Sequence, residues 1–246
     1  MSILKRIAGS RFSEVVPAWM DETVVIIGGG PSLTFEQVGL IRRGHEAGRV
    51  RIIAVNDAYL LSPWAEVHYA ADAKWHAWHT AGIAKPALGL SAAEVRERWA
   101  AFAGEKCSIE CSGAAITSPR VHVMRNAAYP YHSTGLSLDS RGLITGRNSG
   151  FQAFNLATLA GGKTILLVAF DGKPDAQGKN HWFGEHPSQT NPLIYEEIRR
   201  AFSAAERAIA AAGVRVINCS PGSAIDSFPK MELEKALSCV CAAVPA

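Results

Sequence analysis

The chain alternates short apolar runs with longer segments in which apolar residues recur every three or four positions. Near-continuous runs of Val, Ile and Leu are typical of strands that are buried on both faces of a parallel sheet. Such runs predict strands at 23–28, 50–56, 66–72, 163–171 and 214–220, with weaker candidates at 106–111 and 120–126. The longer period predicts helices at 33–47, 91–103, 150–161, 192–212 and 230–241.

The alternation of strands and helices predicts the fold class. Strands that alternate with helices form right-handed βαβ units and an open, mostly parallel sheet. We therefore expect an α/β protein with a Rossmann-like twisted sheet and helices on both faces. No repeat or linker interrupts the pattern, so one domain is expected over residues 1–246, with residues 1–20 as an N-terminal extension.

Two stretches lack any regular pattern. Residues 126–150 are rich in Gly, Ser and Asn, and residues 171–192 follow the most apolar predicted strand. A long irregular loop in a compact domain is usually either functional or disordered. Open α/β sheets bind ligands at the carboxyl ends of their strands, so the second stretch is expected to be an active-site loop.

Composition narrows the class of protein. The chain has 246 residues, of which 48% are hydrophobic and 19% are charged, as in an ordinary soluble globular protein. A formal charge of +3 is too small to favour nucleic acid as the main partner. The sequence contains no apolar run long enough to predict a membrane span. Five cysteines, an odd number, favour a reduced protein in the cytoplasm over a disulfide framework.

The first predicted strand runs into a glycine loop, in the sequence VVIIGGGPSL (24–33). Glycines allow backbone N–H groups to approach a ligand, and the following helix N-terminus adds positive charge that suits a phosphate. Leu33 stands where a dinucleotide-binding motif has its third glycine, and no lysine follows to make a P-loop. A ligand-binding loop and a plain strand-to-helix turn both remain open.

Polar residues also end the next two predicted strands. Asn56 and Asp57 follow one strand, and Asp72 follows the other. Each side chain could cap the helix after it, or could contact a ribose or base. Because several strand ends meet at one edge of a parallel sheet, their number favours ligand contact.

A further candidate anion site begins the helix at 150–161. Arg147, Asn148 and Ser149 precede that helix in the sequence TGRNSGF. The Asn and Ser side chains could cap the helix, or the exposed first-turn N–H groups and the Ser149 hydroxyl could hold a phosphate. Arg147 adds a positive charge to the second interpretation.

The candidate catalytic groups are two histidines in the 171–192 loop. His181 and His186 are five positions apart and lie beside Trp182. Metal binding is disfavoured because no third ligand is at hand. A histidine that titrates near neutral pH could act as a general base toward a hydroxyl group. The alternative is that both histidines are structural or merely exposed.

The order of the motifs carries a resemblance to a known family. IIGGGPSL, AVND, NSGFQAFNLATLAGGKTILLVAFD, NHWFGEH and GVRVINCSPGSAIDSFP follow one another along the chain. In this order they resemble the bacterial sialyltransferases of glycosyltransferase family 42. The chain is also similar to the motility accessory factor proteins and to short phage-encoded relatives of both. The likeness spans nearly the whole chain and is weakest at 85–130.

The resemblance implies a function and a set of site residues. It implies binding of a nucleotide sugar, CMP-linked in the sialyltransferases, and inverting transfer of the sugar to a hydroxyl acceptor, with no tightly bound cofactor. His186 matches the family's general base, and His181 is the second catalytic candidate. The candidate nucleotide-binding residues are Gly28, Gly29, Gly30, Ser32, Asn56, Asp72, Arg147, Asn148, Ser149, Gly150, Asp171 and Lys173.

The chain departs from the family at one point. Family sialyltransferases carry tyrosines after the central strand that support the departing phosphate. The corresponding segment here, FDGKPDAQGKNHW, contains no tyrosine. Lys173, His181 and Trp182 are the candidates to replace them.

Two other functions remain open. Archaeal-type 6-hydroxymethylpterin diphosphokinases share the glycine loop and use magnesium, which Asp57, Asp72 and Asp171 could bind. A non-catalytic nucleotide-binding protein would account for the absent tyrosines. In each case a nucleotide or nucleotide sugar is the expected partner. The acceptor is not indicated by the sequence, and a homo-oligomer is possible.

Overall fold

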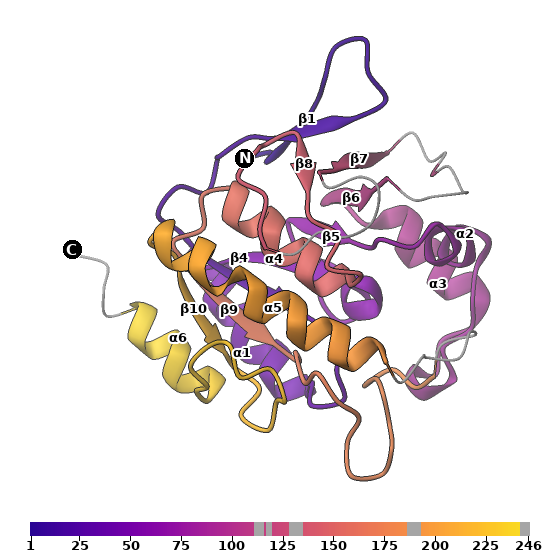
Figure 1. Cartoon of the computed structure of the whole chain (residues 1–246). Coiled ribbons are helices and arrows are strands. Elements are labelled where there is room, and N and C mark those ends of the chain that lie inside the picture. Colours follow the sequence, from indigo (N-terminus) through magenta and orange to yellow (C-terminus); the bar gives the residue numbers. More distant parts are fainter. Residues whose placement is uncertain (111–115, 117–119, 128–134, 186–192, 242–246) are drawn as a thin grey trace.

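The chain folds around an open, eight-stranded parallel sheet (Figure 1). The computed structural model describes residues 1–110, 116, 120–127, 135–185 and 193–241. The strand order is β10-β9-β3-β4-β5-β6-β7-β8, and every neighbouring pair is parallel. The strands are β3 (Thr23–Ile27), β4 (Arg51–Val55), β5 (Val67–Tyr69), β6 (Glu105–Ile109), β7 (Val121–Asn126), β8 (Gly142–Leu143), β9 (Thr164–Val168) and β10 (Arg215–Asn218).

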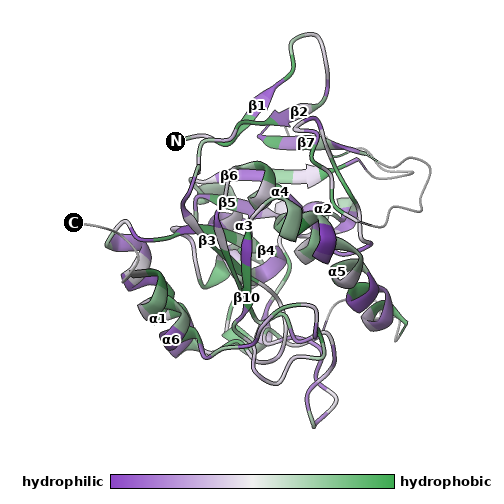
Figure 2. Ribbon diagram, turned by 60° about the vertical axis from the view of Figure 1, so that its left-hand side comes forward, coloured by the Kyte–Doolittle hydropathy of each residue, from purple (hydrophilic) through white to green (hydrophobic). Residues whose placement is uncertain are grey.

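Helices cover both faces of the sheet (Figure 2). Successive side chains of a strand point to opposite faces, so Val24 and Ile26 join one core cluster, and Val25 and Ile27 join the other. The expected Rossmann-like α/β class is therefore confirmed. One face packs on α4 (Ser149–Leu159) and α5 (Ile194–Ala211), and the other on α1 (Phe35–Glu46), α2 (Ala73–Ala81), α3 (Ala92–Ala101) and α6 (Leu233–Cys241).

A small antiparallel hairpin precedes the sheet. It pairs β1 (Leu4–Arg6) with β2 (Ser13–Val15) and lies at the top of Figure 1. Trp19, just after the hairpin, is fully buried, and its backbone N–H donates to the Ala160 carbonyl at 2.8 Å. The N-terminal residues therefore pack onto the main core.

The order in which strands are added to the sheet reverses beside the central strand β3. From β3 the chain builds outward through β4 to β8 and then returns to place β9 on the other side of β3. At such a switch point the loops after the two strands part, and α/β sheets bind ligands in the resulting crevice. The glycine loop follows β3 and the 171–192 loop follows β9, so the topology brings these two segments together.

The structure also contains elements that the hydrophobic pattern does not predict. Two short 3₁₀ helices, η1 (Asn56–Leu60) and η2 (Pro86–Leu88), follow β4 and α2. Helix α2 buries Trp75, His76 and His79. Because two of these buried residues are polar histidines, the helix lacks the apolar periodicity that would predict it. Within the part of the chain that the structure describes, no helix is long and apolar enough to cross a membrane.

Candidate active site

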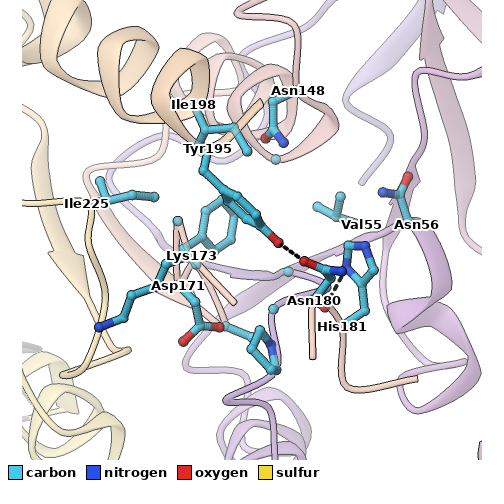
Figure 3. Close-up of a pocket in the computed structure, with 18 of the residues that line it drawn as sticks. Val55, Asn56, Asn148, Asp171, Lys173, Asn180, His181, Tyr195, Ile198 and Ile225 are labelled. Atoms are coloured by element: carbon cyan, nitrogen blue, oxygen red, sulfur yellow. Dashed lines mark hydrogen bonds between the residues drawn. The ribbon is translucent and has the colours of Figure 1, made fainter. Parts of the chain in front are cut away.

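A cavity of about 110 Å³ lies at the carboxyl ends of β3, β4 and β9 (Figure 3). Ligand pockets usually measure about 300–1,000 Å³, so this cavity would enclose only part of a ligand of that size. The lining residues come from loops that are distant in sequence. They are Gly28, Gly29, Gly30, Pro31, Val55, Asn56, Asn148, Gly150, Ala169, Phe170, Asp171, Gly172, Lys173, Asn180, His181, Phe183, Tyr195, Ile198 and Ile225.

The three glycines of the loop serve different purposes. Gly28 donates its N–H to the Val168 carbonyl at 2.8 Å, and Gly30 donates to the Ala169 carbonyl at 3.0 Å. A Cβ at either position would lie 2.6 Å from the Ala169 carbonyl oxygen, so both glycines are required by close packing against the end of β9. The amide of Gly29 has no acceptor among the described residues. It is therefore the loop amide that can bind a ligand.

Asp171 ties this loop to the end of β9. Its carboxylate accepts hydrogen bonds from the Ser32 hydroxyl at 2.9 Å and from the Ser32 N–H at 3.3 Å. Burial raises the pKa of Asp171, and the two bonds from Ser32 oppose that rise. Ser223 supports the same turn from the other side, because its hydroxyl donates to the Phe170 carbonyl at 2.6 Å.

The N-terminus of α4 forms a second wall. The Asn148 side chain caps the helix by accepting the Phe151 N–H at 3.0 Å. The amides of Ser149 and Gly150 have no acceptor among the described residues, and Gly150 lines the cavity. Unpaired first-turn amides at the positive end of a helix favour an anion. The cavity can therefore hold a phosphate here.

Asn56 forms the wall after β4. It adopts a left-handed backbone conformation, with φ of 51°, which is uncommon outside glycine but tolerated by asparagine. His68 holds this turn, since its Nε2–H donates to the Asn56 carbonyl at 3.0 Å. Asn56 and His181 both line the cavity (Figure 3).

His181 is held against the glycine loop. Its Nδ1 lies 3.2 Å from the Gly29 carbonyl oxygen, which can only accept, so Nδ1 carries the hydrogen. Nε2 is then the basic nitrogen of the neutral ring. The imidazole stacks on Phe183 with centroids 4.9 Å apart and planes 5° apart. The ring thus lines the cavity with its Nδ1–H bonded to the glycine loop and its Nε2 buried.

Tyr195 and Asn180 line the cavity, and the sequence analysis named neither as a site residue. The Tyr195 hydroxyl donates to the Asn180 side-chain oxygen at 2.6 Å (Figure 3). Burial, then the charges of Glu185 and Asp171, raise the pKa of Tyr195, so its phenol stays protonated and can donate. Lys173 also lines the cavity, but in Figure 3 its side chain extends away from Tyr195. A tyrosine therefore does stand at the site, supplied by α5.

Several sequence-predicted residues do not line the cavity. The Ser149 hydroxyl accepts the Ala71 N–H at 3.1 Å, and Arg147 pairs with Glu197 at 2.8 Å on the surface. Asp72 is exposed at the start of α2. His186 lies outside the described residues, so its role stays a prediction.

The three carboxylates proposed for magnesium do not come together. Asp57 is fully buried and pairs with Lys85 at 2.7 Å and with His79 at 3.1 Å. The His79 and Lys85 partners hold the pKa of Asp57 well below its usual value, against the effect of burial. No group of three metal-ligating side chains occurs within the described residues.

Comparisons with known proteins show a shared fold. No protein-family model and no curated protein matches the chain. Among solved structures, the sialyltransferase CstII from Campylobacter jejuni in complex with cytidine-5′-monophosphate matches with a TM-score of 0.51 and 13% sequence identity, over 87% of this chain and 86% of that chain. At this identity the match shows the fold alone.

Two weaker matches accompany it. CstII in complex with CMP-3FNeuAc has a TM-score of 0.48 at 12% identity, over 86% of each chain. A short-chain dehydrogenase/reductase from Brucella ovis has a TM-score of 0.30 at 14% identity, over 89% of this chain and 91% of that chain. The likeness to motility accessory factors and phage proteins stays a prediction.

Proposed function

We propose that the protein is a glycosyltransferase that binds a CMP-linked sugar and transfers the sugar to a hydroxyl acceptor. The observation that carries the proposal is the convergence at one cavity of two amides without acceptors, those of Gly29 and Gly150, with a phenol and an imidazole. The amides can bind the donor phosphate, and the Tyr195 phenol can donate to the phosphate oxygen that leaves the sugar. His181 can take the proton of the acceptor hydroxyl. The sialyltransferase-like fold supports the choice of a CMP-linked donor.

In the proposed reaction the acceptor oxygen attacks the anomeric carbon of the sugar. A new carbon–oxygen bond forms there while the bond from that carbon to the phosphate oxygen breaks. A loop histidine takes the acceptor proton, through Nε2 if that residue is His181. The negative charge that develops on the departing phosphate is stabilised by the α4 amides and by the Tyr195 hydroxyl.

His181 and His186 both remain candidates for the base. His181 has the appropriate tautomer at the cavity. His186 is favoured by its match to the family motif. Separate substitutions to alanine distinguish them, because loss of the base abolishes transfer without abolishing nucleotide binding.

The test begins with binding. CMP, CMP-sugars, UDP-sugars and ATP are added at millimolar concentration, and the unfolding temperature is measured. A ligand that binds the folded state stabilises it by RT ln(1 + [L]/Kd), so CMP is expected to raise the unfolding temperature. If no nucleotide does so, the proposal is wrong.

Turnover is tested next by following the hydrolysis or transfer of a CMP-sugar. We expect activity in the wild type and its loss in His181→Ala or His186→Ala. His45→Ala is the matched control, because His45 lies near the last turn of α1 and does not line the cavity. Binding without turnover would instead favour a non-catalytic nucleotide-binding protein. No observation favours the magnesium-dependent diphosphokinase.

A further inference from the structure

A buried lysine lies behind the wall of the cavity without lining it. Lys85 is only 4% exposed, and its ammonium forms the 2.7 Å pair with the fully buried Asp57. Removing two charges from water is costly, and apolar residues of similar volume often replace such a pair with no loss of stability. The energetics of folding therefore do not by themselves explain why an ammonium occupies this position.

Both the backbone and the side-chain ammonium of Lys85 are held in place. Its backbone N–H donates to the Leu90 carbonyl at 2.8 Å, and its carbonyl accepts the Leu90 N–H at 3.1 Å. Its carboxylate partner has two further contacts: His79 Nε2 lies 3.1 Å from Asp57 Oδ1, and the Trp75 indole N–H donates to Oδ2 at 3.4 Å. His79 Nδ1 in turn accepts a hydrogen bond from the Tyr59 hydroxyl at 2.8 Å, so this chain of contacts ends in the core.

The ammonium of Lys85 also contacts the active-site loop. Nζ lies 4.8 Å from the centroid of the Phe183 ring, within the range of a cation–π interaction. Phe183 is the ring on which His181 stacks. The two segments also run close together at Gly184, where an added Cβ would lie 3.7 Å from the Ala87 Cβ. A continuous set of contacts therefore runs from Asp57 through Lys85 and Phe183 to His181.

We propose that Lys85 is a positioning residue, which holds Phe183 in place and thereby fixes the His181 imidazole against Gly29. The inference concerns the same cavity as the proposed function, and its effect on nucleotide affinity rests on that function. Its effect on His181 does not. Asp57, the partner of Lys85, directly follows Asn56 in η1, and Asn56 lines the cavity on the side of β4.

The experiment compares wild type with Lys85→Met, Lys85→Arg and the double variant Asp57→Asn/Lys85→Met. The double variant removes both charges, so it folds even if Lys85→Met alone leaves a buried carboxylate that unfolds the chain. The readout is the ¹⁵N spectrum of the His181 ring, assigned by its disappearance in His181→Gln among the eight histidines. It reports which ring nitrogen carries the hydrogen.

In the wild type we expect hydrogen on Nδ1. In Lys85→Met, and in the double variant whose stability is restored, we expect a mixture of tautomers and CMP binding weakened about tenfold. Lys85→Arg keeps the cation over the ring and should restore the wild-type spectrum. A purely structural role predicts that the double variant recovers both the spectrum and the affinity, and that result would overturn the proposal. If CMP does not bind the wild type, the proposed function fails while the ¹⁵N spectrum still decides the role of Lys85.

Discussion

At the scale of single residues, the glycine loop shows how one motif can both pack against a strand and line a cavity. The sequence analysis named all three glycines as candidate nucleotide-binding residues and left a plain turn open. The structure assigns Gly28 and Gly30 to the contact with β9, because their amides are bonded to Val168 and Ala169 and a Cβ would collide with the Ala169 carbonyl. Gly29 keeps an amide without an acceptor among the described residues. The packing role could not be predicted from sequence, since the strand that requires it lies more than a hundred positions away.

Substituting two neighbouring glycines separates these roles. In Gly30→Ala the new Cβ lies 2.6 Å from the Ala169 carbonyl oxygen and collides with the Asp171 carboxylate, so the unfolding free energy should fall by about 3 kcal/mol. In Gly29→Ala the nearest atoms, in Phe183 and His181, are 3.5 and 3.6 Å away, and stability should change by less than about 1 kcal/mol. Urea denaturation measures both. Equal losses would contradict the packing argument.

Tyr195→Phe tests the hydroxyl that α5 contributes. The ring is kept, and one hydrogen bond to Asn180 is lost, so stability should fall by about 1 kcal/mol or less. If the hydroxyl supports the departing phosphate, CMP-sugar turnover should fall about 10²-fold, as when one donor to a developing charge is removed. Steady-state turnover is the measurement. An unchanged rate would exclude this role for Tyr195.

At the scale of elements, the strands were predictable and the site only in part. Apolar runs identify β3, β4, β5, β9 and β10 because both faces of a parallel sheet are buried. Helix α2 was missed because two of its buried residues are histidines. Tyr195 was missed because the sequence comparison looked for a tyrosine in the loop directly after β9. Tyr195 instead lies in α5, 15 positions after Asn180, and the fold brings the two side chains together.

Helix α4 is anchored by a buried polar residue in its middle. The Asn155 side-chain oxygen accepts the N–H groups of Ser137 and Ile144 at 3.1 and 3.0 Å, and its amide donates to the Ser137 carbonyl at 2.9 Å. Asn155→Leu has a similar volume but leaves these groups unpaired. Since each orphaned buried group costs about 1–3 kcal/mol, we expect a loss of about 4 kcal/mol in urea denaturation.

Thr158→Ala is the control on the same helix. Its hydroxyl donates to the Phe154 carbonyl within the helix at 3.0 Å, and that carbonyl keeps its place in the helix after the substitution. We expect a loss below about 1 kcal/mol. If the two variants lost equal stability, Asn155 would not be the anchor that its contacts indicate.

At the scale of the whole molecule, a cluster of buried histidines links stability to pH. His68, His76 and His79 pack with Trp75 between the sheet and α2. Burial lowers the pKa of all three, that of His76 to about 4 and that of His68 well below its usual value. The folded protein therefore keeps these rings neutral at a pH at which the unfolded chain would protonate them.

The sign of the pH dependence follows. Above about pH 6.5, the pKa of histidine in an unfolded chain, neither state binds the protons and the contribution to stability is complete. As the pH falls from about 6.5 toward 4, the unfolded state gains protons that the folded state cannot take, so the unfolding free energy decreases. Urea denaturation at several pH values measures this slope. His76→Phe should make it shallower, and a flat profile in the wild type would contradict the burial of neutral histidines.

The placement of β9 beside β3 has a consequence for biosynthesis. Ser32 and Asp171, which hold the two halves of the cavity together, are 139 positions apart. A nascent chain emerges from its N-terminus first. The edge of β3 that pairs with β9 therefore stays unpaired while the middle of the protein is translated. An unpaired strand edge is prone to wrong pairing. We therefore expect β3 to be open to wrong pairing during translation until β9 has been made.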